Sequence, residues 1–380
     1  MRVLFFATRM PDLCGAFLHD IDLAIELQKR GHQVTFMTTE KPKEGYGGGM
    51  YRGFRFMHYT AGTELLESSQ VWICPHAPAL PIVRKINSRG LDRPMVATCH
   101  FDGRYRAITD NITGQWNEML FFINRKMESN FRGAAVPWPR SIVRTDVIRP
   151  IMHEDKIRMD PYPSGDMITL VNANVNKGVH QFIELAKRMP DRRFLGVVPY
   201  YGELWVPPAP ANIEWTKFDD DVRNILSRTR ILLMPSKYES FGRIAVEAMY
   251  NKIPVIYSKP NPNAEAPGTT EGVEEWILPA GIACDRDRPE HWMAAITSLD
   301  DPEVYAARQE VCKECVTNMD LFTEAPRIAE KVEAFVRENP VVVKTLEERA
   351  AAGQPQIPRV PQMPVGAALG FSGGRLKIRR

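Results

Sequence analysis

One stretch in the second half of the chain constrains the fold more than any other, because a strand, a loop, a helix and a second strand follow one another without interruption. Residues 231–234 (Ile-Leu-Leu-Met) are a short apolar run that ends at Pro235, as a buried parallel strand does. Residues 241–250 are helical in composition, and residues 253–256 (Ile-Pro-Val-Ile) are rich in β-branched side chains. This succession predicts a parallel sheet whose strands are connected by helices.

Two carboxylates flank the turn from this loop into its helix. Glu239 precedes the helix, and Glu247 follows after seven intervening residues, about two turns inside it. Ser240 and Gly242 lie where the first unpaired helix N–H groups are expected, and such a helix start favours an anion. The loop also follows the carboxyl end of a strand, which is where open α/β sheets bind ligands. Two acids beside an anion site indicate a ligand that is part phosphate and part hydroxyl-rich, and a nucleotide sugar fits that description.

The same order of strand, loop and helix recurs earlier in the chain. Near the N-terminus, a predicted strand over residues 2–8 is followed by a loop with Gly15 and an amphipathic helix over residues 17–30. Further on, a predicted strand over residues 167–172 leads through Lys177 into another helix. Each half of the chain therefore has a helix start that suits an anion.

The length of the chain and a Pro- and Gly-rich segment predict its domains. A chain of 380 residues suits two domains, and the Pro- and Gly-rich residues 160–166 form a predicted linker. We expect an α/β protein with two Rossmann-like β/α/β domains that face a cleft. Residues 1–160 would form the acceptor-side domain and residues 161–335 the nucleotide-sugar-binding domain. Residues 336–380 would complete a helix and continue as a flexible, basic Pro- and Gly-rich tail.

The central stretch resembles a known family. Residues 239–248 (Glu-Ser-Phe-Gly-Arg-Ile-Ala-Val-Glu-Ala), followed by Ile-Pro-Val-Ile, are similar to the E-x(7)-E signature of retaining glycosyltransferases with the two-domain GT-B fold, especially family 4. The resemblance implies that Glu239 lies near the donor sugar hydroxyls and that Glu247 binds the ribose hydroxyls. It also implies that backbone amides over residues 241–244 hold the diphosphate and that Lys177 contacts it.

The first half carries weaker parts of the same resemblance. Residues 30–34 (Arg-Gly-His-Gln-Val) are similar to the end of the family's first helix, whose preceding loop reaches the donor phosphate, here at Gly15. A strand that runs into His100 is similar to the family's P-V-V-x-T-x-H segment, in which the histidine faces the donor sugar or the acceptor. The family commonly has an arginine at the position of Asn172, and Arg243 is the residue that could replace its charge.

These considerations give a set of predicted site residues. The predicted catalytic residues are Glu239, His100 and Lys177. The predicted donor-binding residues are Gly15, Lys177, Ser240, Phe241, Gly242, Arg243, Ile244 and Glu247. The acceptor-side candidates are His76, Asp102 and Arg104. We expect no metal ion and no cofactor, because GT-B enzymes mostly need none and the nucleotide sugar is a substrate.

Composition and charge limit the partners. The formal net charge is only +3, which gives no reason to expect a strong polyanion partner, although local patches can be hidden in a small total. Residues 104–144 nevertheless interleave basic and aromatic side chains, as a nucleic-acid groove or a segment that shapes an acceptor site would. No run approaches the roughly 18 apolar residues that span a bilayer. We therefore expect a cytoplasmic protein, located in the host cytoplasm if it is viral.

The predicted function is that of a retaining glycosyltransferase that moves a sugar from a nucleoside diphosphate sugar, with UDP favoured, to a hydroxyl acceptor. The acceptor would be a small molecule or a glycan. One alternative is a phage-type DNA glycosyltransferase that acts on a hydroxylated base, because of the basic and aromatic stretch and the basic tail. Another alternative, of a different class, is a non-catalytic GT-B protein that binds a nucleotide or a nucleic acid.

Overall fold

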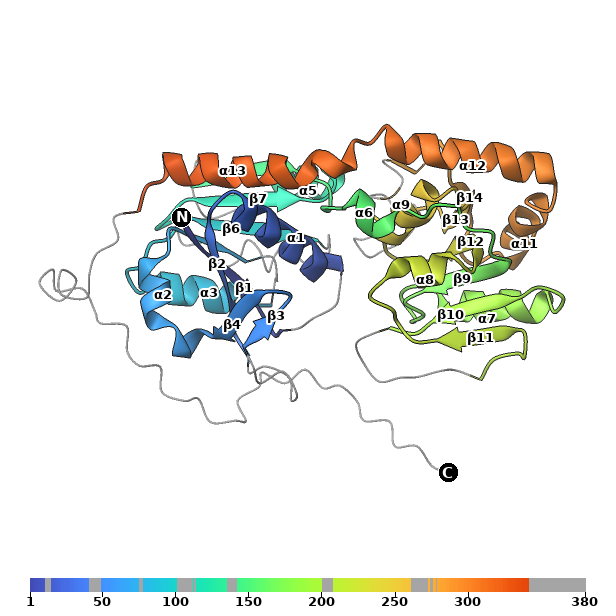
Figure 1. Cartoon of the computed structure of the whole chain (residues 1–380), viewed down its shortest axis with the longest axis horizontal. Coiled ribbons are helices and arrows are strands. Elements are labelled where there is room, and N and C mark those ends of the chain that lie inside the picture. Colours follow the sequence, from blue (N-terminus) through green and yellow to red (C-terminus); the bar gives the residue numbers. More distant parts are fainter. Residues whose placement is uncertain are drawn as a thin grey trace, which may run out of the picture.

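Two sheets covered by helices lie side by side, one built from the first part of the chain and one from the second (Figure 1). The computed structural model describes residues 1–10, 15–40, 49–74, 78–100, 112, 114–134, 142–199, 208–260, 273, 276–277 and 279–341. The predicted α/β architecture with two Rossmann-like halves is confirmed.

The first sheet lies in the N-terminal half. Its strands are β1 (Arg2–Ala7), β2 (Gln33–Thr38), β3 (Met50–Tyr51), β4 (Phe54–His58), β5 (Val71–Ile73), β6 (Met95–Cys99), β7 (Glu118–Phe122) and β8 (Val143–Val147). They follow the order β3-β4-β2-β1-β5-β6-β7-β8, and every pair is parallel except β3 with β4. The helices described in this half are α1 (Gly15–Lys29), α2 (Thr63–Ser68), α3 (Leu80–Asn87) and α5 (Arg125–Gly133).

The second sheet is parallel throughout the described residues. Its strands are β9 (Met167–Val171), β10 (Phe194–Val197), β11 (Ile213–Thr216), β12 (Thr229–Met234), β13 (Val255–Ser258) and β14 (Ile282–Cys284), in the order β11-β10-β9-β12-β13-β14. The short helix α6 (Glu154–Ile157) precedes this sheet. The other helices are α7 (Val179–Arg188), α8 (Val222–Leu226), α9 (Arg243–Tyr250), α11 (Pro289–Ser298), α12 (Pro302–Thr317) and α13 (Glu324–Glu338).

The strand orders place the loops that matter for function. Each sheet is wound outward in both directions from its first strand, so the order reverses between β1 and β5 in the first sheet and between β9 and β12 in the second. In doubly wound sheets, ligands bind at this reversal, outside the carboxyl ends of the strands. The loops that follow β9 and β12 are therefore the expected binding loops of the second sheet.

Strands β7 and β8 of the first sheet were not predicted. They pair in register from Glu118 with Val143 to Phe122 with Val147, and β7 lies inside the stretch that was interpreted as basic and aromatic. The aromatic side chains of that stretch that the structure describes are in the hydrophobic core: Trp116, Phe121, Phe122 and Phe131. They pack the sheet and are not available as stacking platforms for bases, so this part of the argument for a nucleic-acid groove was wrong.

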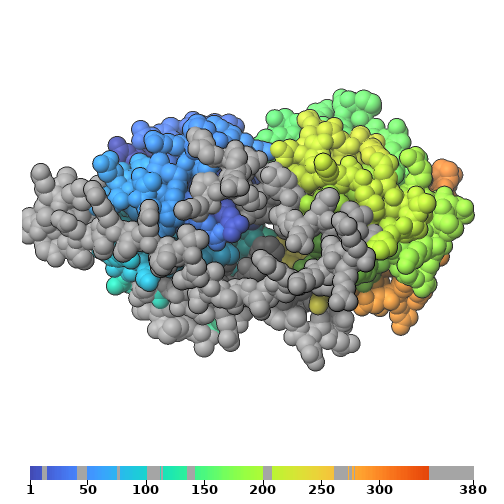
Figure 2. Space-filling model, turned by 90° about the horizontal axis from the view of Figure 1, so that it is seen from below, coloured from blue at the N-terminus to red at the C-terminus, as the bar shows by residue number. Residues whose placement is uncertain are grey.

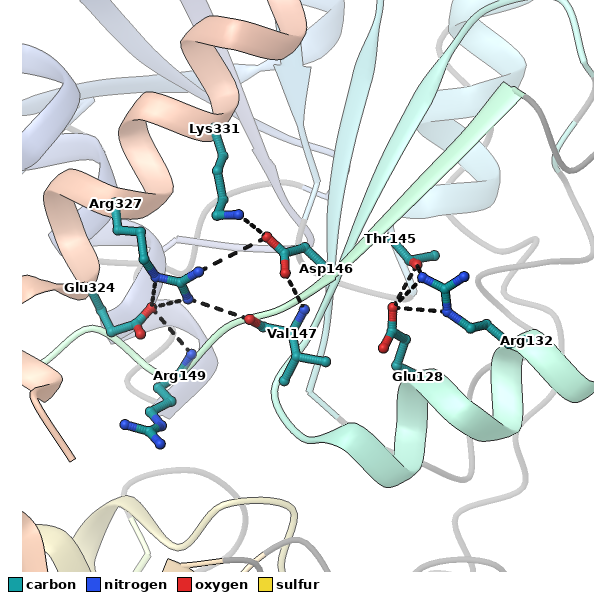
Figure 3. Close-up of polar contacts among 9 residues, drawn as sticks. All are labelled: Glu128, Arg132, Thr145, Asp146, Val147, Arg149, Glu324, Arg327 and Lys331. Atoms are coloured by element: carbon teal, nitrogen blue, oxygen red, sulfur yellow. Dashed lines mark hydrogen bonds and ion pairs between the residues drawn. The ribbon is translucent and has the colours of Figure 1, made fainter. Parts of the chain in front are cut away.

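The last helix returns to the first domain. Helix α13 packs along α1 and β8, whereas α12 lies over the second domain (Figure 1). Lys331 forms an ion pair with Asp146 of β8, and Arg327 Nη2 donates to the carbonyl of Val147 at 3.4 Å (Figure 3). Glu324 Oε2 accepts from Arg327 Nη2 at 2.6 Å. The chain therefore crosses between the domains twice, once before β9 and once after α12.

Figure 2 shows blue residues of the first domain and yellow-green residues of the second on the same face of the molecule. Side chains from both domains meet at the boundary between them, as the contacts below show. Among the described residues, no helix has the length and apolar character needed to cross a bilayer.

Candidate active site

The two binding loops of the second sheet touch each other. Gly178 caps the N-terminus of α7 with a left-handed φ of 83°, and a Cβ at this position would lie 2.3 Å from the carbonyl oxygen of Pro235. The amide of Lys237 also donates to the carbonyl of Asn176 at 2.8 Å. Only glycine allows this approach, which explains why glycine follows Lys177 and how the two loops come to form one site.

The predicted residues Lys177 and Glu239 meet where the loops join. Lys177 Nζ forms an ion pair with Glu239 Oε1, and Ser236 Oγ donates to the same oxygen at 2.8 Å. The Glu239 carboxylate is 6% exposed, and its Oε2 has no hydrogen bond among the contacts of the described residues. Glu239 thus has one oxygen fixed by a cation and a hydroxyl, and one left for a ligand.

The turn between Glu239 and α9 presents a run of free donors. Within the described residues, the backbone amides of Ser240 to Ile244 donate to no acceptor. Gly242 has a left-handed φ of 77° and caps α9. Helix α9 begins at Arg243 rather than at the predicted Phe241, so two more amides lie in the turn. Unpaired N–H groups at a helix start form an anion site.

Arg243 links this turn to the second acid and to the first domain. Its Nε donates to Glu247 Oε1 at 2.9 Å, and its Nη1 donates to the carbonyl of Ile151 at 3.0 Å. Its Nη2 lies 3.9 Å from Asp22 Oδ2 of α1. The guanidinium of Arg243 is thus already in contact with protein acceptors through all three nitrogens.

Glu247 is a buried acid with one oxygen in use. Burial raises its pKa, and the nearby Arg243 guanidinium opposes that rise. Its Oε2 has no hydrogen bond among the contacts of the described residues. A largely buried carboxylate that is held by arginine on one side can accept hydrogen bonds from ligand hydroxyls on the other.

The first domain contributes a pair of histidines. His100 follows β6, is 8% exposed, and packs edge-on against His19 of α1 with 5.5 Å between ring centroids. His19 Nδ1 accepts from the amide of Ile151 at 3.0 Å. Burial lowers the pKa of His19 to about 4, so its ring is neutral at pH 7. Because Nδ1 is an acceptor, the neutral ring carries its proton on Nε2.

The other predicted residues lie away from the contacts described above or outside the described residues. Gly15 is the first residue of α1, and a Cβ there would meet no atom within 4 Å. His76, Asp102 and Arg104 lie outside the described residues. Asn172, where an arginine was expected from the resemblance, has a left-handed φ of 62° at the end of β9.

Three residues of the site were not predicted, and two of them come from other parts of the chain. Ser236 holds Glu239, and Asn124 donates from Nδ2 to the carbonyl of Ser240 at 2.9 Å. Trp276 Nε1 donates to the carbonyl of Phe241 at 2.9 Å. Only Ser236 had a local signal, since it lies in the stretch from which the prediction began.

Part of the chain matches a known family model. Residues 208–314 match the family model described as glycosyl transferases group 1. This range contains β12, α9 and both acids of the turn. No curated protein sequence matches the chain.

Solved structures match over nearly the whole chain. Sucrose-phosphate synthase from Thermosynechococcus elongatus is 13% identical, with a TM-score of 0.69, over 89% of this chain and 98% of that one. WaaG, a glycosyltransferase involved in lipopolysaccharide biosynthesis, is 13% identical, with a TM-score of 0.61, over 87% and 99%. An α-glucosyltransferase in complex with UDP and a 13-mer DNA containing an HMU base is 13% identical, with a TM-score of 0.57, over 87% and 99%. The chain therefore has the GT-B fold of these glycosyltransferases, and residues 208–314 of its second domain match the glycosyl transferases group 1 model.

Proposed function

We propose that this protein is a retaining, family-4-like glycosyltransferase that transfers a sugar from a nucleoside diphosphate sugar, with UDP favoured, to a hydroxyl acceptor without a metal ion. The observation that carries the proposal is the run of unpaired amides from Ser240 to Ile244, placed between the two buried acids Glu239 and Glu247. Donors for phosphate and acceptors for hydroxyls thus lie on one short segment, and a nucleotide sugar needs both.

Each part of the donor has a matching group. The amides would bind the diphosphate and stabilise the negative charge that grows on the leaving phosphate, because preorganised donors cost no rearrangement during the reaction. Glu247 Oε2 would accept the ribose hydroxyls. Lys177, already beside Glu239, would face the diphosphate, while Glu239 Oε2 and His100 would hold the sugar.

Retention in this site needs no covalent intermediate in our proposal. A carboxylate that forms a covalent bond must offer an oxygen as nucleophile, and Glu239 is held by Lys177 and Ser236, which lower the reactivity of its charge. We therefore infer that the acceptor hydroxyl attacks on the face from which the phosphate leaves. The leaving phosphate, whose growing negative charge the amides stabilise, would accept the proton of the acceptor hydroxyl.

Nucleotide binding tests the donor assignment. The purified protein is screened by thermal shift against UDP, GDP, ADP and TDP, since a ligand that binds only the folded state raises the melting temperature. We expect one base to give a clear shift, and Glu247→Ala to reduce the affinity for that nucleotide about tenfold or more, as expected for a lost charge-assisted hydrogen bond. The variant Glu338→Ala, whose charge lies at the exposed end of α13, is the control and should bind as the wild type does.

Activity separates an enzyme from a binding protein. Slow hydrolysis of the selected nucleotide sugar should be present in the wild type and lost in Glu239→Gln, while nucleotide binding is retained. A protein that binds no nucleoside diphosphate would contradict the donor assignment. A protein that binds one but turns over no sugar conjugate would support the alternative of a non-catalytic GT-B protein.

The acceptor is tested by the same assay. The default acceptor is a small molecule or a glycan. DNA with a hydroxylated base remains the second candidate, because one structure of similar fold contains an α-glucosyltransferase with DNA. Two described arginines of the basic stretch, Arg132 and Arg144, are already paired with Glu128 and Glu338, which weakens this candidate. Transfer to DNA that falls steeply with salt would restore it.

A further inference from the structure

Two side-chain donors, one from each domain, hold the turn over residues 240–244, which is the proposed phosphate-binding turn. Asn124, in the loop between β7 and α5 of the first domain, donates from Nδ2 to the carbonyl of Ser240 at 2.9 Å. Trp276 of the second domain donates from Nε1 to the carbonyl of Phe241 at 2.9 Å, and its ring packs against the Phe241 ring with centroids 5.5 Å apart. Two consecutive carbonyls of the turn therefore have fixed partners.

Fixing a carbonyl also fixes the amide that follows it. A trans peptide unit is planar, and its C=O and N–H groups point in opposite directions. The bond from Asn124 to the Ser240 carbonyl thus sets the direction of the Phe241 N–H, and the bond from Trp276 sets that of the Gly242 N–H. Within the described residues, neither N–H has an acceptor. A donor that is held in one direction without an acceptor is a preorganised ligand contact.

The orientation of the Asn124 amide is itself determined. Its Oδ1 accepts from the amide of Met127 at 2.8 Å and so caps α5, while its Nδ2 donates to the carbonyl of Ser240 in the turn. The two contacts require an acceptor on one side and a donor on the other, so the side chain cannot be rotated by 180° without losing both. Asn124 is 4% exposed, which excludes water as an easy substitute.

We propose that Asn124 is a positioning residue through which the first domain aims the Phe241 amide at the donor diphosphate, so that the phosphate site of the second domain is complete only when the first domain is docked against it. The proposal rests on the proposed function, because the diphosphate is the ligand of that same site. It adds that Asn124 of the first domain helps to build the anion site without itself touching the diphosphate.

The test uses variants that separate capping from positioning. Asn124→Ser keeps a side-chain oxygen that can cap α5 but has no group long enough to reach Ser240. Asn124→Asp keeps the shape and the cap but replaces the N–H donor with an oxygen that faces a carbonyl. The probes are UDP, inorganic pyrophosphate and uridine, measured by calorimetry on the full chain. GDP and guanosine replace UDP and uridine if the nucleotide screen selects guanine.

We expect Asn124→Ser to weaken UDP and pyrophosphate binding about tenfold, the size of one lost charge-assisted hydrogen bond, and to leave uridine binding unchanged. Asn124→Asp should weaken the phosphate ligands further. Trp276→Phe, which keeps an aromatic ring and loses the N–H donor, should show the same selective loss. Melting temperatures serve as the check on folding.

Two outcomes would overturn the inference. One is UDP binding by Asn124→Ser at wild-type affinity. The other is an equal loss of uridine and UDP binding, which would mean that the side chain supports the fold in general. If the wild type bound neither UDP, GDP nor pyrophosphate, the proposed function itself would fail, and this result differs from both.

Discussion

At the scale of single residues, two glycines with the same backbone conformation have very different surroundings. Gly178 and Gly90 both have positive φ, at 83° and 84°. A Cβ on Gly178 would lie 2.3 Å from the Pro235 carbonyl oxygen, whereas a Cβ on Gly90 would meet no atom within 4 Å. The first glycine is needed for an approach of two chains, and the second only for its backbone conformation.

This contrast gives a matched pair of substitutions. Both Gly178→Ala and Gly90→Ala place a side chain in a left-handed conformation, which costs about 1–2 kcal/mol. Gly178→Ala should lower the free energy of unfolding by about a further 1–3 kcal/mol, because the added methyl group forces the two binding loops apart. Urea denaturation measures the difference. Nucleotide affinity should fall only in Gly178→Ala, and equal effects of the two substitutions would contradict this account.

At the scale of secondary structure elements, α13 holds the first domain through a small number of charges. Glu333 accepts from Arg30 Nε and Nη2, both at 2.8 Å, and lies 2.8 Å from His32 Nε2. The Arg30 guanidinium lowers the pKa of Glu333 to about 2. An acid with a lowered pKa stabilises the fold above its ordinary pKa of 4.5, and this contribution is lost as the pH falls toward 2.

Replacing this acid should loosen the helix. Glu333→Gln is expected to lower stability by about 1 kcal/mol at pH 7, and to speed hydrogen exchange of the amides of α13. The control is Glu330→Gln on the same helix, because Glu330 lies 3.8 Å from Arg30 Nη1 with 65% of its side chain exposed. That change should stay within about 0.5 kcal/mol. The difference between the variants should vanish near pH 2, and its persistence there would refute the electrostatic explanation.

At the scale of the whole molecule, Asp22 joins three parts of the chain. It lies on α1 of the first domain and binds Lys156 Nζ of the crossing segment at 2.7 Å. His153 Nε2 lies 3.2 Å away, and Arg243 Nη2 of the second domain lies 3.9 Å away. Burial opposes the charge of Asp22, but His153 and Lys156 outweigh it and lower the pKa of Asp22 below 3.8. The contacts therefore persist until the pH falls below 3.8.

The neighbouring Asp20 offers a control for this role. Burial raises the pKa of Asp20 well above its ordinary value, so the fold disfavours its charged form. Asp22→Asn should cost about 2 kcal/mol and increase the radius of gyration in small-angle X-ray scattering, because it removes a buried charge that Lys156 and Arg243 share. Asp20→Asn removes a charge that burial disfavours and should cost less than about 1 kcal/mol. A larger effect of Asp20→Asn than of Asp22→Asn would contradict this account.

The sequence by itself determined the elements whose signal is local. The apolar runs of β1, β9 and β12, the helix that follows Lys177 and the position of Gly242 at a helix start were all predicted, because strand burial, helical periodicity and helix starts depend on neighbouring residues. The resemblance around Glu239 and Glu247 also lies within one continuous segment, and so the GT-B fold could be expected before the structure was known.

Only the tertiary structure decided the rest. Strand β7 begins with Glu118, and a charged residue at this position made the strand hard to recognise in the sequence. In the structure Arg84 of α3 pairs with this acid, and its Nε donates to Glu118 Oε1 at 2.9 Å. Asn124 carries no local sign that it serves a turn in the other domain. Contacts between residues far apart in the chain leave no periodicity in either segment, since each segment is shaped to fit a surface that forms only on folding. The contacts that position the site could therefore be recognised only once the two domains were seen together.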